Sequence, residues 1–323
     1  MSDTSSRKLH IDLLRVIACL GVIAVHTTST YSRFCSGCVT LFFVLSGASW
    51  LTKDVIDIKV LWNKYIKRLV IAFLFWSLIY DVYQFIILPI LSKQQIDYKF
   101  VVTGLVKGPF HFWFLWVLLG IYLAMPILQR IAADRGLLIY ITSILFILSV
   151  FIPYLQEISI LGWTVELTNY IGWSGFLYAF YFLLGGLLEK IEKKWIRKVY
   201  VIISLCFINV ITFILLFLGY PLGFHRVFET LWMMSGFLLV KSTCINMIYN
   251  SDSKIAKIAS CTFGIYCIHV LLSLLCRLSF NDWMSEMIDN IWISDAIRYI
   301  LVTTVSFGLV YLLKKVPIVR KLF

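Results

Sequence analysis

Apolar stretches long enough to cross a lipid bilayer follow one another along almost the whole chain of 323 residues. About 20 apolar residues in a helix span the hydrocarbon layer, and a backbone in lipid must satisfy its own hydrogen bonds. The composition agrees, since 61% of the residues are hydrophobic and only 14% are charged, against about 25% in a soluble domain. The chain is therefore predicted to be an all-α, polytopic membrane protein.

The apolar stretches predict about ten transmembrane helices in one integral-membrane domain, residues 1–323, without a soluble domain or an internal repeat. The first stretch contains Asp12 and Arg15 and leads directly into further spans, so it is interpreted as a retained helix rather than a cleaved signal peptide. The second stretch is short and contains Gly47, which favours a tilted or partly re-entrant segment. The expected spans are 11–30, 38–52, 68–91, 112–129, 137–155, 172–188, 199–219, 228–246, 259–278 and 293–313.

The net charge of +12 has a topological explanation. With ten spans and a cytoplasmic N-terminus, most Lys and Arg residues fall in the inner segments, as the positive-inside rule requires. Both termini are then cytoplasmic. The basic residues are expected to contact anionic membrane lipid, and they indicate no nucleic-acid partner.

Three ionisable residues on the first predicted helix are expensive to place in a bilayer and therefore indicate function. Asp12, Arg15 and His26 are separated by three and eleven residues, which is about one and three helical turns, so they share one face. Cys19 and Val22 complete this narrow face, which is expected to look into the helix bundle. A histidine is the usual general base when a hydroxyl must lose its proton.

A structural reading of the same residues also exists. Asp12 and Arg15 can form a charge pair that anchors the helix at the cytoplasmic boundary, where an arginine side chain extends to the water. That reading does not explain His26, which lies about 16 Å further along the helix axis.

A second basic cluster, Lys64, Lys67 and Arg68, precedes the third expected helix with the spacing of one helix face. Such a cluster can hold phosphate groups, or it can be a positive-inside anchor without a ligand. His111 and Trp113 open the fourth expected helix at the outer interface, where aromatic residues are common.

Tyr266 and His269 face one way near the middle of the ninth expected helix, and a histidine there requires a polar partner. His10 is expected in the loop before the first helix. The Cys35-x-x-Cys38 pair has no partner cluster that would complete a zinc site. A local disulfide and two free thiols both remain open for this pair, and the chain has no Gly-x-Ser-x-Gly elbow, Walker loop or metal-ligand spacing.

Five segments, in the same order along the chain, resemble the motifs of the integral-membrane acyltransferase family three. The first helix is similar to the opening signature of that family, an acidic residue followed by Leu-Arg and a terminal histidine. The likeness extends over the whole chain, and it is greatest to the short O-acetyltransferases of bacterial surface polysaccharides, of the enterobacterial common antigen type. The resembling segments are His10–Ala18 with His26-Thr27-Thr28, Leu41–Gly47, Lys67-Arg68-Leu69, His111–Leu115 with Tyr122–Pro126, and Gly264–His269.

The resemblance implies transfer of an acetyl group from cytoplasmic acetyl-CoA to a hydroxyl of a surface glycan or lipid-linked sugar, in a multi-pass protein of the bacterial inner membrane. No metal is expected, because the chain has no metal-ligand spacing. His26 is the expected general base, with Asp12 and Arg15 as its catalytic partners. One departure is that the family often has Arg-x-x-Arg where this chain has Lys64-x-x-Lys67, and lysine lacks the arginine fork that matches phosphate. The residues expected to bind the donor are Arg15, Lys64, Lys67, Arg68, His111, Trp113, Tyr266 and His269.

Direct attack of the sugar hydroxyl on the thioester and a relay through an acetylated histidine are both compatible with these residues. A membrane transporter of polysaccharides or small molecules is the alternative from another class, because transporters also bury histidines and charge pairs. A membrane partner without chemistry would leave the intramembrane His and Arg unexplained.

Overall fold

A computed structural model describes residues 7–35, 37–95, 104–157, 176–218, 222–244, 247, 249–250, 253–288, 290–317 and 320. These residues form helices, turns and loops, and none of them lies in a β-strand. The chain divides into two compact units, Met1–Asp54 with Leu128–Phe307 (unit 1) and Val55–Ile127 with Gly308–Phe323 (unit 2). The all-α prediction is thus confirmed for the described part of the chain.

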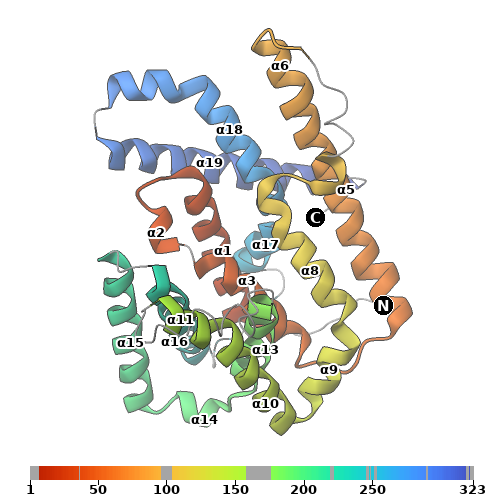
Figure 1. The fold of residues 1–323 in the computed structure, drawn as a ribbon, viewed down its shortest axis with the longest axis vertical. Helices are drawn as coiled ribbons and strands as arrows, with labels where there is room; N and C mark the ends of the chain where they lie inside the picture. The colour runs from red at the N-terminus through yellow and green to blue at the C-terminus, as the bar shows by residue number, and fades with distance from the viewer. Residues whose placement is uncertain are drawn as a thin grey trace. The chain divides into compact units, whose positions relative to one another are not determined.

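Unit 1 holds the first helix and most of the C-terminal half of the chain (Figure 1). Its elements are α1 (Leu9–Thr27), α2 (Ser32–Cys35), α3 (Gly37–Trp50), α10 (Arg135–Phe146), the π-helical turn η4 (Ile147–Phe151), α11 (Ile152–Glu157), α13 (Leu177–Lys190), α14 (Lys193–Ile196), α15 (Val199–Phe217), α16 (Leu222–Cys244), α17 (Lys254–Ala259), α18 (Thr262–Met287) and most of α19 (Ile291–Leu313).

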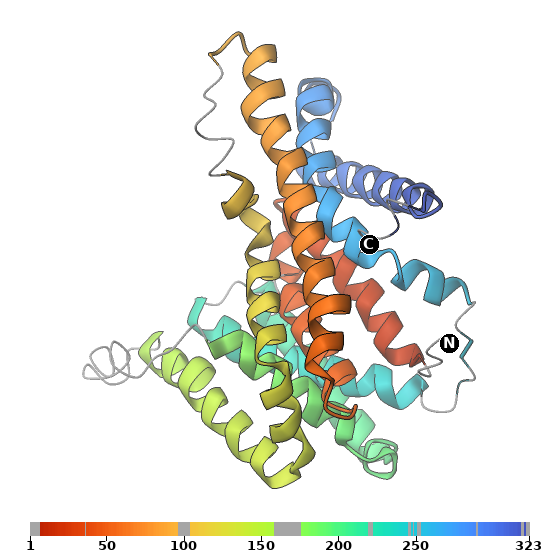
Figure 2. The ribbon, with the colours of Figure 1, turned by 90° about the vertical axis from the view of Figure 1, so that its right-hand side faces the viewer.

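Unit 2 is built around one long helical rod, which Figure 2 shows in orange along most of its length. The rod, Ile58–Leu91, runs without interruption for 34 residues. Its parts are α4 (Ile58–Val60), the π-helical turn η1 (Leu61–Ile66), α5 (Lys67–Val82), the π-helical turn η2 (Tyr83–Ile87) and α6 (Leu88–Leu91). The 3-10 turn η3 (Phe110–Phe112) and α8 (Trp113–Leu123) follow, and α9 (Met125–Ala133) crosses the boundary to unit 1.

Four described helices are long and apolar enough to cross a membrane, namely Leu9–Thr27, Ile58–Leu91, Arg135–Leu155 and Ile291–Leu313. A fifth crossing is formed if Phe110–Leu123 and Met125–Ala133, which are bent by 62°, count as one broken span. Pro126 near the start of α9 explains the break, because proline cannot donate the helical hydrogen bond. The membrane character is therefore confirmed, whereas the number of ten crossings and the cytoplasmic termini remain predictions.

Some predicted helix boundaries are wrong. The first helix ends at Thr27 rather than residue 30, and the third begins at Ile58 rather than residue 68, because Asp57 caps its N-terminus by accepting a hydrogen bond from the Val60 N–H (3.1 Å). The second helix, Gly37–Trp50, has 14 residues. It is too short for an upright crossing, as expected.

Close helix packing forms the core of unit 1. Helix α3 packs on α13, and α1 packs on α3 and α18. The α3–α13 crossing depends on Gly47 and Gly185, since a Cβ atom on either would overlap the backbone carbonyl of Phe182 or Val44. Small residues of this kind let helix backbones approach one another in membranes.

Helices α15 and α19 carry many large apolar side chains on their exposed surfaces, among them Val199, Phe207 and Ile300 with 71%, 65% and 61% of their area accessible. Exposed apolar side chains of this size are suited to contact with lipid tails. Their exposure supports the membrane assignment independently of helix length.

Candidate functional site

The predicted polar face of α1 is directed toward protein. Asp12, Cys19 and Val22 are 2%, 2% and 3% exposed, while Arg15 and His26 are half-buried. Helix α18 covers this face, and the Cys19 thiol lies 3.9 Å from the Thr262 carbonyl oxygen. The face thus lies at a helix–helix contact inside unit 1.

Asp12 is the centre of a charged cluster at the N-terminal end of α1. Its Oδ2 accepts hydrogen bonds from Arg7 Nε (2.8 Å) and from the Tyr249 hydroxyl (2.6 Å), and its Oδ1 accepts a longer one from Arg15 Nη1 (3.4 Å). Burial and the hydrogen bond to Asp12 raise the pKa of Tyr249, so its hydroxyl keeps the proton that it donates. The predicted Asp12–Arg15 pair exists, but two residues outside the predicted set bind the carboxylate more closely.

His26 lies at the other end of α1, beside His269 of α18. The two imidazole centroids are 5.2 Å apart, with the rings inclined at 48°. His269 is fully buried, and its Nδ1 lies 3.0 Å and 2.9 Å from the Ile265 and Tyr266 carbonyl oxygens. Carbonyl oxygens only accept, so Nδ1 carries the proton, and in the neutral ring Nε2 is the acceptor.

The space between α1 and α18 next to this pair is narrow. It is lined by Cys19, Val22, Ile23, Phe42, Ile265, Tyr266 and His269, and it has no room for a water molecule. Tyr266 and His269 therefore do share one side, as predicted, and their rings are 6.1 Å apart.

The basic cluster Lys64, Lys67 and Arg68 lies in unit 2, where all three side chains are exposed. Lys64 belongs to the π-helical turn η1, with its ammonium 5.4 Å from the Tyr65 ring, and the other two open α5. The prediction that the cluster starts a helix is wrong, because the helix already begins at Ile58. The cluster is nevertheless an accessible group of positive charges.

His111 and Trp113 lie in different environments of unit 2. His111 is 2% exposed, and its ring centroid lies 5.2, 5.3 and 4.7 Å from those of Tyr80, Phe110 and Phe112. Trp113 is 39% exposed. The two residues therefore do not form one surface.

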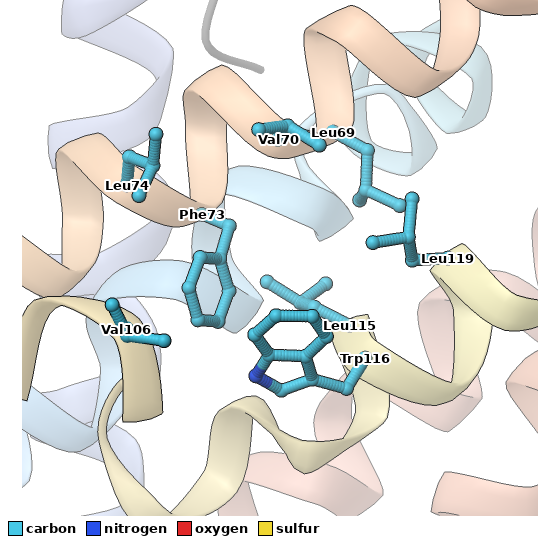
Figure 3. Close-up of a pocket in the computed structure, with 8 residues that line it drawn as sticks. All are labelled: Leu69, Val70, Phe73, Leu74, Val106, Leu115, Trp116 and Leu119. Atoms are coloured by element: carbon cyan, nitrogen blue, oxygen red, sulfur yellow. The ribbon is translucent and has the colours of Figure 1, made fainter.

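An apolar cavity of about 110 Å³ lies between α5 and α8 in unit 2 (Figure 3). The Phe73 ring and the Trp116 indole face it, and neither His111 nor Trp113 lines it. Its lining contains no charged side chain, so it offers nothing to the phosphates of a nucleotide. The lining residues are Leu69, Val70, Phe73, Leu74, Val106, Leu115, Trp116 and Leu119.

The structure thus divides the predicted site residues between the units. Unit 1 brings Asp12 together with Arg15, and His26 together with His269 and Tyr266. Unit 2 holds the three exposed cations, His111 and Trp113.

Several buried polar residues were missed by sequence reasoning. His10 is not a loop residue: it lies in α1, and its Nε2 is 2.9 Å from the buried Glu189 carboxylate, which also accepts from Lys8. Asp81 and Asp295 are 4% and 2% exposed. Asp12 was identified because a carboxylate inside an apolar stretch has a high free-energy cost. The same criterion would have identified Asp81 and Asp295.

Cys35 and Cys38 are unbridged, the first half-buried and the second buried. Within the described ranges, no group of three His, Cys, Asp or Glu side chains is placed to hold a metal ion.

Comparison with known proteins identifies the family. No curated protein and no solved structure matches the chain. A family model described as an acyltransferase domain matches residues 9–315, nearly the whole chain, and the transporter alternative is not favoured. This chain of apolar helices, in which the imidazoles of His26 and His269 lie side by side, is matched over almost its full length by this model; it belongs to acyltransferase family 3 and is a membrane acyltransferase.

Proposed function

We propose that the protein is an O-acetyltransferase of the bacterial inner membrane, which moves an acetyl group from acetyl-CoA to a hydroxyl of a surface glycan or lipid-linked sugar. The single observation that carries the proposal is the position of His26. It lies at the end of a spanning helix, beside a second imidazole and on the face that holds Arg15.

The chemistry requires one base and one leaving group. A neutral His26 ring accepts the proton of the sugar hydroxyl as its oxygen attacks the thioester carbonyl carbon. The new C–O bond forms, the C–S bond breaks, and the CoA thiolate leaves and takes the proton from the His26 imidazolium, which returns the ring to its neutral form. The neighbouring His269 ring is neutral when Nδ1 alone carries a proton, so it does not repel the imidazolium that forms on His26.

Binding of the donor needs positive charge for its phosphates. Arg15 offers a guanidinium that is 31% exposed and held by Asp12 in unit 1. In unit 2, Lys64, Lys67 and Arg68 offer three exposed cations. Each group is a candidate by itself, and substitution of one group at a time separates their contributions to the KM for acetyl-CoA.

Substitution of His26 tests the proposal. We expect His26→Ala to lower the transfer of radiolabelled acetyl from acetyl-CoA into the glycan fraction of bacterial membrane vesicles by about 10²-fold or more, the usual contribution of a general base. Stabilisation of the purified protein by CoA in thermal unfolding should persist, because the donor phosphates bind elsewhere.

A matched control is available on the same helix. His10→Gln removes an imidazole that is paired with Glu189 and lies sixteen residues from His26, so its transfer rate per folded molecule should stay near wild type. Wild-type transfer by the His26→Ala protein would refute the proposed role.

A further inference from the structure

Asp295 is a buried carboxylate on α19, one of the helices long and apolar enough to span the membrane. It is 2% exposed. A carboxylate is costly at such a place unless hydrogen bonds compensate it. The hydrogen bonds that compensate this cost identify the groups that Asp295 binds.

The Asp295 carboxylate accepts hydrogen bonds from the two residues that lie just beyond the end of α1, Ser29 and Thr30. Its Oδ2 accepts from the backbone N–H groups of Ser29 and Thr30 (2.8 and 2.9 Å) and from their hydroxyls (3.1 and 2.8 Å). Its Oδ1 accepts from Arg298 Nη1 (3.3 Å). One oxygen thus orders two consecutive residues through four donors.

His26 lies three residues before this clamp. The Ser273 hydroxyl of α18 donates to the His26 carbonyl oxygen (3.3 Å), and the hydroxyls of Thr27 and Thr28 donate back into the last turn of α1 (2.7 and 2.8 Å). The end of a helix frays unless its terminal residues are held. Here α18 holds it from one side and Asp295 of α19 from just beyond it.

We infer that Asp295 is a positioning residue for His26: by binding Ser29 and Thr30, it holds the last turn of α1 so that the His26 ring stays beside His269. The inference rests on the proposed function, in which His26 is the base. Asp295 acts through the backbone, because its carboxylate binds the N–H groups of Ser29 and Thr30, which follow His26 in the chain.

A second α19–α1 hydrogen bond provides a control. The Tyr299 hydroxyl donates to the Leu20 carbonyl oxygen (3.3 Å), six residues before His26. Tyr299→Phe removes this bond and leaves the Ser29–Thr30 clamp in place. If contact between α19 and α1 alone matters, Tyr299→Phe and a substitution of Asp295 should both lower kcat. If Asp295 positions His26, only the substitution of Asp295 should lower kcat.

The first test separates turnover from donor binding. In membrane vesicles with radiolabelled acetyl-CoA, we expect Asp295→Ala to lower kcat about tenfold or more, because small displacements of a catalytic group are costly. The KM for acetyl-CoA should change by less than about twofold, since Arg15, the donor-binding candidate of unit 1, lies about three helical turns before His26 on α1. Tyr299→Phe should remain within about twofold of wild type in both constants.

Two further variants keep the test decisive if Asp295→Ala does not fold. Asp295→Asn retains one acceptor oxygen and should recover part of kcat. The double variant Ser29→Ala/Thr30→Val removes two of the four donors and should lower kcat by a smaller factor in the Asp295→Asn background than in wild type, because the residues act as one unit. Additive losses would overturn the inference.

A readout without activity separates this inference from the proposed function. Diethylpyrocarbonate modifies accessible histidine rings, and peptide mass spectrometry measures the rate of modification at His26. This rate should be higher in Asp295→Ala than in wild type or Tyr299→Phe. If wild type transfers no acetyl or His26→Ala stays active, the proposed function fails. If both behave as expected but Asp295→Ala matches Tyr299→Phe in kcat and in His26 modification, only the positioning role fails.

Discussion

Asp12 accepts hydrogen bonds from three side chains, one before α1, one within it and one in the segment before α17. The sequence identified the carboxylate and its i, i+3 partner Arg15, because both stand out in an apolar stretch. It did not identify Tyr249, which lies 237 residues away. A residue in a polar segment has no periodicity that marks it as a partner.

Removal of the Tyr249 hydroxyl tests the weight of this long-range contact. Tyr249→Phe should destabilise the protein by about 1–2 kcal/mol, somewhat below the usual value for a hydrogen bond to a charged group because the site is partly exposed. Thermal unfolding in one detergent measures the change.

Tyr31→Phe is the matched control for this prediction. It removes a hydroxyl that donates to the neutral Trp292 carbonyl oxygen at an exposed position (3.0 Å), so its effect should be smaller, about 0.5 kcal/mol. An equal decrease in the free energy of unfolding in both variants would show that the charge of Asp12 does not strengthen the Tyr249 hydrogen bond.

At the scale of elements, helices were predictable from apolar length, and their ends often were not. Asp295 binds the segment that follows the end of α1 at Thr27, and the early start of the long helix depends on the Asp57 cap. Both residues lie outside the apolar run that predicted the helix. The π-helical turns in Ile58–Leu91 likewise leave no mark in the apolar pattern.

The contact between α3 and α13 gives a prediction at this scale. Gly185→Ala should destabilise the protein by about 3 kcal/mol or more, the upper range of overpacking, because the new methyl group would overlap backbone atoms of Val44 and Ala48 that cannot rotate away. Gly120→Ala in α8 should be neutral or stabilising by up to about 1 kcal/mol, since nothing lies within 4 Å of its added Cβ.

Thermal unfolding of both variants in the same detergent checks this packing argument. Equal midpoints for Gly185→Ala and Gly120→Ala would contradict the close approach of the two helices.

For the whole molecule, the distribution of basic residues predicts orientation rather than fold. Lys and Arg concentrate in segments expected to be cytoplasmic, which places both chain ends on that side. The helices and the family assignment support a multi-pass membrane protein. Neither depends on which side the termini face.

Reporter fusions test the orientation. A fluorescent protein after Phe323 should fluoresce, and alkaline phosphatase inserted after Lys194 should be inactive, because both sites are predicted to be cytoplasmic. Alkaline phosphatase inserted after Lys93 should be active on the outer side. Activity after Lys194 together with a dark C-terminal fusion would invert the assignment.

The sequence by itself determined that this chain is a helical membrane protein and that Asp12, Arg15 and His26 lie on one helix face, because apolar length and helical period are local properties. Only the tertiary structure decided that His269 is the neighbour of His26, and that Asp295 orders the segment after α1. These contacts join residues more than two hundred positions apart. No local pattern encodes which buried partner a polar group meets, since that depends on how the helices pack.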